Sequence, residues 1–172
     1  MLNLRPLKGS DFKQYCENEK SYYKELERNP RFGVGTYGKK ADAKYLKESF
    51  SRLILAQKSG KGFTIVAEYK GKMVGICSVE PSGWREGPHI GEIGFSVLKG
   101  YRHKGIGSAM LKEAIARARG KYEILSAGTY TINKESEALM KKFGFKVWGI
   151  APRFIKRGKI YLSAEMLYLM LK

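Results

Sequence analysis

A strand end, a cationic glycine turn and a helix start follow one another directly near the middle of the chain. The turn, Arg102 to Gly107, reads Arg-His-Lys-Gly-Ile-Gly, and apolar residues at helical spacing follow it as far as Ala118. The first N–H groups of a helix have no intrahelical partner and carry partial positive charge, so they stabilise an anion. The glycines let the backbone approach that anion closely, and the cationic side chains add attraction. This junction therefore predicts a phosphate site.

The spacing of the turn separates it from two common phosphate loops. A Walker loop requires Gly-x-x-x-x-Gly-Lys-Ser/Thr, and a dinucleotide fold requires Gly-x-Gly-x-x-Gly with a later acidic residue. The turn from Arg102 to Gly107 matches neither pattern. Taken alone, the turn is also compatible with a tight strand-to-helix connection that binds nothing. Its pattern does resemble Arg/Gln-x-x-Gly-x-Gly/Ala, the pyrophosphate loop of the GNAT family of N-acetyltransferases.

A second motif downstream strengthens this resemblance. The segment from Asn133 to Phe145 is similar to the family pattern Asn-x-x-Ala/Ser-x-x-Leu-Tyr-x-Lys-x-Gly-Phe. The resemblance covers the chain from roughly Phe63 to the C-terminus and implies an acetyl-CoA-dependent N-acetyltransferase. One departure concerns the Tyr of this pattern, which many members place near the CoA sulfur as a proposed general acid. Met140 stands there in this chain, and a thioether cannot donate a proton.

The resemblance also implies how acetyl-CoA is held. In the family the sheet splays between the strand that here ends at Val97 and the strand near Glu123 to Thr131. The pantetheine arm enters that gap and pairs with exposed backbone groups like an added strand. The residues expected to contact the cofactor are Phe95, Ser96, Val97, Arg102, His103, Lys104, Gly105, Ile106, Gly107, Ser108, Asn133 and Ser136.

Acetyl transfer to an amine requires a proton acceptor, because alkyl amines are mostly protonated near neutral pH. Glu92 is the candidate base, since several family members carry a Glu there that works through water. The alternative is that Glu92 lies on a solvated strand face or pairs with a Lys. The N–H group of Val97 is expected to polarise the thioester oxygen. Tyr130 and Tyr161 are the candidate acids in place of the missing Tyr, with a role in the core as the alternative.

Two loops, over residues 29–40 and 81–88, are expected to wall the acceptor site. Tyr37 and Trp84 are the acceptor contacts chosen from them, together with Glu165. Glu165 lies in a C-terminal segment that resembles the family ending Gly-Lys-x-x-Asp-Glu-x-x-Met-Tyr, with spacing one residue off. The acceptor classes left open are a protein N-terminus, a lysine, an amino acid and a polyamine. The segment from Ile150 to Tyr161 is similar to ribosomal-protein and amino-acid acetyltransferases and favours a small or N-terminal amine.

Composition indicates one domain over residues 1–172, with 43% hydrophobic residues, enough for a core without disulfides or metals. Cys16 and Cys77 have no paired spacing, which favours free thiols in a reducing compartment. With two histidines and no Cys-x-x-Cys, no metal site is expected. The N-terminus does not resemble a signal peptide and no apolar run is long enough to span a bilayer, so a cytoplasmic protein without membrane contact is expected.

The charge balance is unusual, with 33 Lys and Arg against 16 Asp and Glu, a net charge of +17. Such an excess favours anionic partners, and CoA is itself anionic. The cations are spread along the whole sequence and no RNA-binding motif occurs, so a dedicated nucleic-acid site is not favoured. The alternative to the enzyme is a non-catalytic CoA-binding or RNA-associated module. A homodimer is compatible with the sequence.

The order of expected elements predicts an α+β domain, with a mixed, mostly antiparallel, splayed sheet of about seven strands and about four helices, as in the family. Hydrophobic periodicity and Gly, Pro and Asn punctuation delimit them. Strands are expected over residues 2–7, 63–69, 73–79, 91–97 and 123–131, with further strands from 148 to the end. The second and third of these flank Lys70-Gly71-Lys72, which predicts an antiparallel hairpin. Helices are expected from Ser10 to a stop at Asn29-Pro30, over residues 42–58 and 106–118, and from Asn133.

Overall fold

The computed structural model describes residues 1–31 and 41–171. Its α-helices are α1 (Phe12–Arg28), α2 (Ala43–Lys58), α3 (Ile106–Ala118) and α4 (Lys134–Lys142). Its strands are β1 (Leu2–Pro6), β2 (Phe63–Tyr69), β3 (Lys72–Pro81), β4 (Ile90–Val97), β5 (Ile124–Tyr130), β6 (Lys146–Arg157) and β7 (Ile160–Met170). The short 3₁₀ helices are η1 (Gly9–Asp11) and η2 (Lys99–Tyr101).

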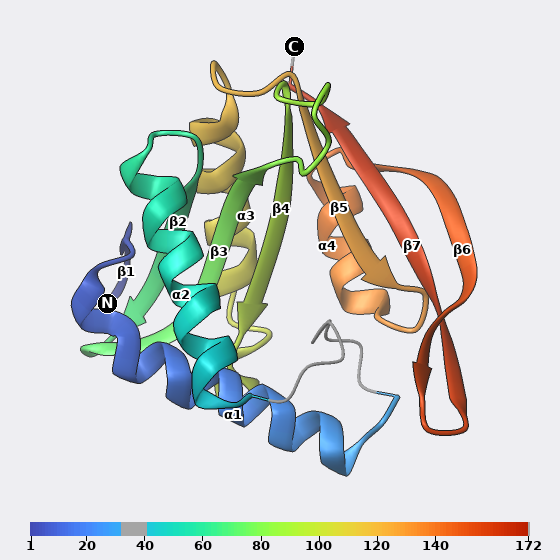
Figure 1. Ribbon diagram of the computed structural model, residues 1–172, viewed down its shortest axis with the longest axis horizontal. Helices are drawn as coiled ribbons and strands as arrows, with labels where there is room; N and C mark the ends of the chain where they lie inside the picture. Colours follow the sequence, from blue (N-terminus) through green and yellow to red (C-terminus); the bar gives the residue numbers. More distant parts are fainter. Residues whose placement is uncertain (32–40, 172) are drawn as a thin grey trace.

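The strands form one 7-stranded sheet in the order β1-β2-β3-β4-β5-β7-β6. Every neighbouring pair is antiparallel except β4 and β5, which are parallel. Helices α1 and α2 cover one face of the sheet, and α3 and α4 cover the other (Figure 1). The predicted α+β architecture with a mixed, mostly antiparallel sheet is confirmed.

Two apolar cores fill the space between these layers. Under α1 and α2, the core contains Leu46 and Phe50 from α2 and Val66 from β2. On the opposite face, Met110 and Leu111 of α3 pack into a larger core with side chains of the central strands. Burial of these side chains is the main favourable contribution to folding, at about 25 cal/mol for each Å² of apolar surface removed from water. The central strands are therefore covered on both faces.

Local sequence explains where the helices begin and end. The residue before a proline is disfavoured in helical conformation, and α1 ends at Arg28, directly before Asn29-Pro30. At the start of α2, the Asp42 side chain accepts a hydrogen bond from the N–H of Tyr45 at 2.8 Å. Both boundaries match the sequence prediction. The turn η1 stands where the first helix was expected to begin, and α1 itself starts at Phe12.

The β2–β3 hairpin was predicted from Lys70-Gly71-Lys72 and is confirmed. Lys70 and Gly71 both have positive φ values, of 50° and 73°, and Tyr69 pairs with Lys72. Two successive positive φ values are the geometry of the tight turn that matches the twist of paired strands.

The parallel pair β4–β5 is short and then opens. Ile90, Gly91 and Glu92 pair with Ile124, Leu125 and Ser126, and beyond Glu92 no ladder joins the two strands in the described part of the chain. Strand β4 continues to Val97 and β5 to Tyr130, so the two strands separate toward their C-terminal ends (Figure 1). The splay predicted from the family resemblance is confirmed. Helix α3 follows β4 and α4 follows β5, so one helix begins on each side of the opening.

The C-terminal hairpin β6–β7 is long and irregular. Its register shifts between Val147 and Gly149 and again between Ala151 and Ile155, so β6 carries bulges that β7 lacks. Strand β7 pairs with β5 only from Ala164 onward, and the earlier part of the hairpin projects past β5 (Figure 1). Among the described helices, none is long and apolar enough to cross a membrane.

Candidate active site

The junction between β4 and α3 leaves the start of the helix open. Gly105 occupies the N-cap position with a φ of 77°, a left-handed conformation that residues with a side chain adopt only with strain. No side chain caps this end of α3, and its first turn contains no acidic residue. The first N–H groups of α3 are therefore free of the local caps found at α2 and α4. This geometry fits the predicted phosphate site.

Gly107 serves the packing of α3 against α4. A Cβ atom at this position would lie 3.1 Å from Cδ2 of Leu139, closer than most real contacts. No atom lies within 4 Å of the corresponding position at Gly105. The two glycines of the motif thus have different roles: Gly105 provides a backbone conformation, and Gly107 allows two helices to approach.

Arg102 is engaged by α1. Its two terminal nitrogens donate to Glu25 Oε1 and Oε2 at 2.7 and 2.8 Å, and its Nε donates to the carbonyl of Val97 at 2.9 Å. The side chains of Arg102 and Glu25 are 21% and 17% exposed, so the pair is largely shielded from water. A bidentate Arg–carboxylate pair is among the stronger polar contacts in proteins. Arg102 therefore fastens the turn to α1 and to the end of β4, and a phosphate could reach its guanidinium only in competition with Glu25.

The other two cations of the turn lie at the surface. His103 is exposed, has a φ of 59°, and its Nε2 lies 3.5 Å from Oε1 of Glu135 on α4. Lys104 is exposed, and its Nζ donates to the carbonyl of Gly100 at 3.0 Å. Both side chains lie beside the open end of α3, where they add positive charge without being buried.

The backbone of β4 presents donors to the opening. The N–H of Leu98 bonds to the carbonyl of Val74 on β3, and N–H groups point to alternate sides along a strand. The N–H groups of Phe95 and Val97 therefore point away from β3, toward the gap beside β5. Ser96 points its side chain to the face that α1 covers, where it lies next to Tyr22. Main-chain contacts of Phe95 and Val97 with the cofactor stay a prediction.

Asn133 and Ser136 meet at the start of α4. The Asn133 side-chain oxygen accepts a hydrogen bond from the N–H of Ser136 at 3.1 Å, which is an ordinary N-cap. Both residues were predicted to contact the cofactor. The structure places them beside the splay and uses the Asn133 side chain to cap the helix.

Two carboxylates lie side by side on the α2 face of the sheet. Glu92 is exposed, and its Cα pairs across the strands with that of Glu80 on β3. Burial raises the pKa of Glu80, Arg52 at 3.6 Å opposes this shift, and the charge of Glu92 adds to it. Glu92, the predicted base, is therefore accessible, and Glu80 is a neighbour that sequence reasoning missed.

The two candidate acids lie on opposite faces of the sheet. Tyr130 pairs with Ala164 of β7 and shares the face of Glu92, because Glu92 pairs with Ser126 and side chains alternate along β5. Tyr161 is three positions before Ala164 and faces the other way, where Arg153 lies 4.0 Å from its ring centre. Met140 is fully buried in the larger core. Tyr130 thus shares the face of the predicted base, four residues beyond its partner Ser126, and Tyr161 lies on the other face.

The predicted acceptor contacts are not brought together. Trp84 is exposed on the β3–β4 connection, at the end of β4 opposite to the splay (Figure 1). Glu165 is 5% exposed and pairs with Thr129, on the α4 face, and its charge raises the pKa of Lys141 after the larger effect of Glu137. It therefore faces away from Glu92. Tyr37, with most of the 29–40 loop, lies outside the described residues.

Helix α1 contributes polar residues that sequence reasoning did not assign. Glu19 lies on the buried face of α1 between Tyr15 and Tyr22, and burial raises its pKa to about 7. Burial likewise raises the pKa of Tyr22 to about 12, with Ser96 beside it opposing the shift. The available signal was an acidic residue at a position where the helical period expects an apolar one.

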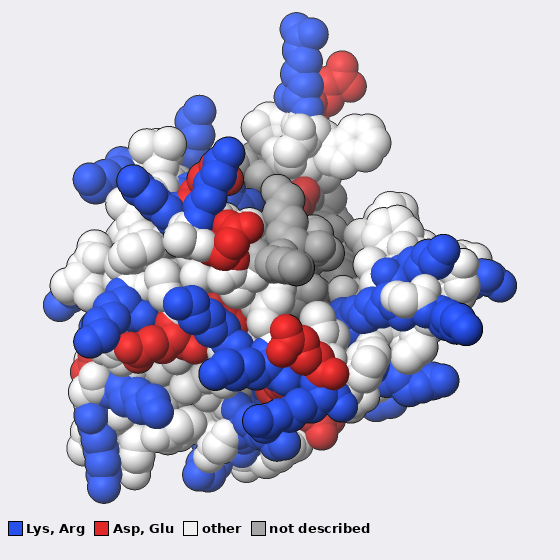
Figure 2. Space-filling view, turned by 60° about the horizontal axis from the view of Figure 1, so that its bottom comes forward, with Lys and Arg blue, Asp and Glu red and all other residues white. Residues whose placement is uncertain are grey.

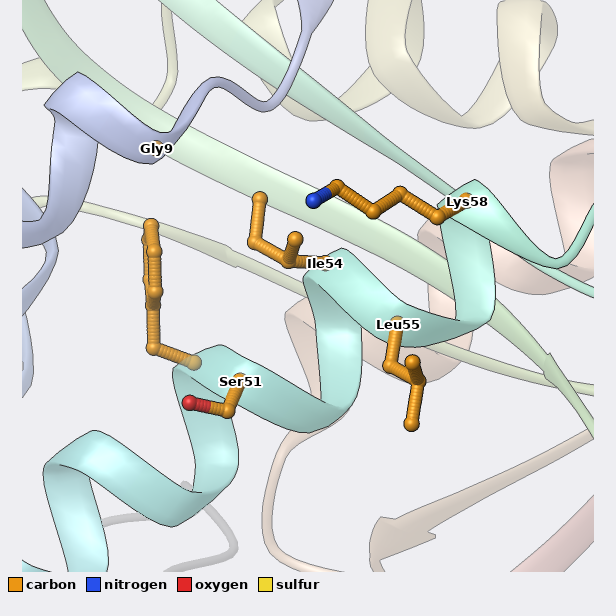
Figure 3. Close-up of a pocket in the computed structure, with 6 residues that line it drawn as sticks. Gly9, Ser51, Ile54, Leu55 and Lys58 are labelled. Atoms are coloured by element: carbon orange, nitrogen blue, oxygen red, sulfur yellow. The ribbon is translucent and has the colours of Figure 1, made fainter.

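Two further features bear on what the site is. In residues 1–31 and 41–171, no group of three or more His, Cys, Asp or Glu could hold a metal ion. A shallow apolar depression lies along α2 near Gly9, lined by Phe50, Ile54, Leu55 and the stem of Lys58 (Figure 3). It lacks any pair of titratable groups and lies away from the splay. The splay and the open start of α3 therefore remain the candidate site.

Comparisons with known proteins agree with this geometry. A sequence profile described as "Acetyltransferase (GNAT) family" matches residues 19–145. No curated protein matches the chain. The N-acetyltransferase from Staphylococcus aureus Mu50 superposes with a TM-score of 0.84 at 24% identity, covering 100% of this chain and 99% of that one.

Two other structures show the same fold. The ribosomal-protein-alanine N-acetyltransferase from Brucella melitensis has a TM-score of 0.82 at 23% identity, with 98% of this chain and 99% of that one covered. A putative acetyltransferase from Salmonella typhimurium, solved with its cofactor acetyl-CoA, has a TM-score of 0.84 at 18% identity, with 99% and 94% covered. Because the family profile spans most of the sequence and the splayed sheet is present, this chain belongs to the acetyltransferase (GNAT) family.

Proposed function

We propose that this protein transfers an acetyl group from acetyl-CoA directly to a primary amine. The observation that carries the proposal is the β4–β5 splay, which ends at a helix whose first N–H groups no side chain caps. Family membership supports the same reaction. Acetyl-CoA would supply the activated acetyl group as a thioester.

The chain offers a fitting set of donors for such a cofactor. Backbone N–H groups from Gly105 to Ser108, with Ile106 and Gly107 between them, would hold the pyrophosphate at the open start of α3. His103 and Lys104 would add charge at the surface. The N–H groups of Phe95 and Val97, which point into the splay, would hold the extended arm in the manner of an added strand. We assign the oxyanion-stabilising donor to Val97, at the end of that row.

The acceptor amine must lose a proton, and two carboxylates are candidates to accept it. Glu92 is accessible on β4, but five residues of extended strand separate it from Val97, which is about 16 Å at about 3.3 Å per residue. A proton from an amine near Val97 would therefore reach Glu92 through water. Glu19 lies nearer that end of β4, because its neighbour Tyr22 lies beside Ser96. A pKa of about 7 also suits a general base at neutral pH.

The leaving thiolate needs little assistance, since its pKa is not far from neutral and the start of α3 is positive. Tyr130 is the remaining candidate acid, because it shares the face of Glu92 and Arg157 lies 5.1 Å from its ring centre. Tyr161 has no place in this scheme, since it lies on the opposite face with Arg153. We propose a small amine or a protein N-terminus as acceptor, and the similarity to the ribosomal-protein-alanine N-acetyltransferase of Brucella melitensis supports the latter.

The first test is thermal unfolding with and without excess acetyl-CoA. The control ligand is adenosine, which lacks the phosphates and the pantetheine arm. A ligand that binds only the folded state raises the midpoint by mass action. A rise with acetyl-CoA alone supports the cofactor assignment, and no rise at saturating concentration contradicts it. A rise without thiol release in any amine screen would favour the alternative, a non-catalytic CoA-binding module, for which the buried Met140 is the motivating observation.

The base is identified by pH profiles of kcat/KM for Glu92→Gln and Glu19→Gln. If Glu92 accepts the proton, Glu92→Gln lowers kcat roughly 10²- to 10⁴-fold while acetyl-CoA affinity is retained. If Glu19 does, Glu19→Gln removes the ascending limb near pH 7 and Glu92→Gln has little effect. Glu17→Gln, an exposed position on the same helix, is the matched control. Activity unchanged in both variants would exclude both carboxylates.

A further inference from the structure

Strand β6 exposes aromatic and apolar side chains together with cations, both where β7 is still paired with β5 and in the projecting part of the β6–β7 hairpin. Trp148 is 65% exposed and Phe154 is 67% exposed, and both belong to β6, the edge strand of the sheet. The hairpin surface, as we call it, comprises Trp148, Ile150, Arg153, Phe154, Lys156, Lys159 and Tyr161. Neither the core nor the β4–β5 splay uses these side chains, so the surface needs its own explanation.

Cations and rings are stacked on this surface. The guanidinium of Arg153 lies 4.0 Å from the ring centre of Tyr161, and Nζ of Lys156 lies 5.6 Å from the same ring. Arg153 has a φ of 55° at the second bulge of β6 and its N–H donates to Oγ of Ser163. The bulge thus turns Arg153 onto Tyr161. Planar guanidinium and aromatic faces side by side form a platform on which a flat base can stack.

The charge on this surface has one sign. From Lys146 to Ala164 the chain contains no Asp or Glu. Figure 2 shows Lys and Arg side chains gathered on the projecting lobe at the right, where the hairpin lies in Figure 1, with no acidic side chain visible on it. Figure 2 also shows Lys and Arg over the rest of this face, but there acidic side chains lie among them. The hairpin differs because its cations have no acidic neighbours on it, which favours a polyanionic partner.

A second copy of this chain fits the surface poorly. A symmetric dimer would place the same patch of both subunits face to face, so cations would oppose cations. This edge is also protected from pairing with a strand of another molecule, by Pro152, by the bulges and by the Lys and Arg side chains. An acidic protein surface would satisfy the cations but would leave the exposed rings without flat partners. Unstacked bases satisfy both requirements.

We infer that the hairpin surface binds single-stranded nucleic acid, with Lys156, Lys159 and Arg153 contacting phosphates and Trp148 and Phe154 stacking on bases. Trp148 and Phe154 are six residues apart, but the bulged stretch of β6 from Gly149 to Ile155 spans only four residues of β7, which is about 13 Å at about 3.3 Å per residue. That length accommodates a segment of several nucleotides. The binding is independent of the proposed acetyl transfer and uses none of its residues except the candidate acid Tyr161, which the structure places here.

The test is fluorescence anisotropy of a labelled oligouridylate of about ten nucleotides, titrated with the full chain at several salt concentrations. Three phosphate contacts predict a slope of log affinity against log salt near −2, from about −0.7 for each contact on a single strand. Lys156→Gln/Lys159→Gln should reduce the magnitude of that slope by about 1.4. The matched control, Lys44→Gln/Lys47→Gln, removes the same charge from exposed positions of α2 and should leave the slope nearly unchanged.

The aromatic contribution is measured with Trp148→Ala/Phe154→Ala, against Trp84→Ala on the distant β3–β4 connection as control. Loss of stacking should weaken binding roughly tenfold or more at unchanged salt slope, and a blunt duplex of the same length should bind less tightly than the single strand. Equal slopes in the two lysine double variants would overturn the inference, because binding would then reflect diffuse charge. It is also overturned if the oligonucleotide does not bind at low salt, or if sedimentation shows a dimer that Trp148→Ala/Phe154→Ala dissociates.

Discussion

Two helices begin beside the splay, and their first turns are built in opposite ways. Helix α4 follows β5 and closes its own start: Asn133 caps the N–H of Ser136, and Glu135 and Glu137 occupy the first turn. Helix α3 follows β4 and begins at Gly105, with neither a capping side chain nor an acidic residue in the first turn. An anion is therefore stabilised at α3 and repelled at α4. Glycine motifs at helix starts point to a ligand when the usual cap is missing.

The strongest way to break this contrast is Gly105→Val. A β-branched residue at a φ of 77° is strained, and relaxing that strain would turn the N–H groups of α3 away from the phosphate. We expect acetyl-CoA affinity, measured by calorimetry, to fall roughly 100-fold or more, which corresponds to about 3 kcal/mol. Gly100→Ala is the control, since that position has space for a Cβ and no positive φ. An unchanged affinity in Gly105→Val would show that α3 does not hold the cofactor.

The next largest effect on affinity is expected for Glu25→Gln, which weakens the Arg102–Glu25 ion pair between α1 and the turn. One hydrogen bond to Arg102 can persist, but the charge-assisted bidentate pair is lost. We expect acetyl-CoA affinity to fall about tenfold, or about 1.4 kcal/mol, because the turn is less firmly held. Glu27→Gln, exposed on the same helix, should have no effect. A gain in affinity would instead show that Arg102 is a phosphate ligand restrained by Glu25.

A smaller effect is expected for Asn133→Ala, which removes the cap of α4. Loss of an N-cap lowers the free energy of unfolding by about 1 kcal/mol, so the midpoint of urea unfolding should fall while acetyl-CoA affinity changes less than about threefold. Asp42→Ala, the equivalent cap of α2, should have the same effect on stability and none on binding. If Asn133→Ala weakened binding strongly and Asp42→Ala did not, Asn133 would also contact the cofactor.

The smallest effect is a pH dependence at the start of α4. Hydrogen bonds from Lys134 and Lys141 lower the pKa of Glu137 to about 2, below its ordinary value of 4.5. A depressed pKa gives stability that is present above pH 4.5 and lost as the pH falls toward 2. Glu137→Gln should therefore lower the thermal midpoint slightly at pH 7, and the difference from the unaltered protein should vanish near pH 2. A difference independent of pH would mean that the carboxylate contributes by packing.

Much of the fold could be predicted because its signals are local. The cationic turn, the period of Ile106 to Ala118, the stop at Asn29-Pro30 and the Lys70-Gly71 turn each act within a few residues. The splay and the identity of the sheet came from the two motifs and their family. These predictions were confirmed without any knowledge of distant contacts.

The site residues were harder to place, because their positions depend on long-range register. Arg102 forms an ion pair with Glu25, which is 77 positions earlier in the chain, and no local sequence pattern predicts that pair. Whether Tyr161 or Glu165 faces Glu92 depends on counting from Tyr130 across β5 and β7, where one position reverses the face. Trp84 follows β3 directly, yet its connection lies at the wrong end of β4. The spacing of residues in a motif predicts which residue types lie near a site. The register of strand pairing decides which face of the sheet their side chains occupy.

The Arg102–Glu25 ion pair has a thermodynamic consequence for how the enzyme binds two substrates. Glu25 belongs to the last turns of α1, three residues before the helix ends, while Arg102 belongs to the cofactor turn and also holds the carbonyl of Val97. A molecule that binds beside α1 and shifts it must alter the affinity at the turn. Linkage then requires the cofactor to change the affinity of that molecule by the same factor. A single ion pair thereby makes the two binding events reciprocal.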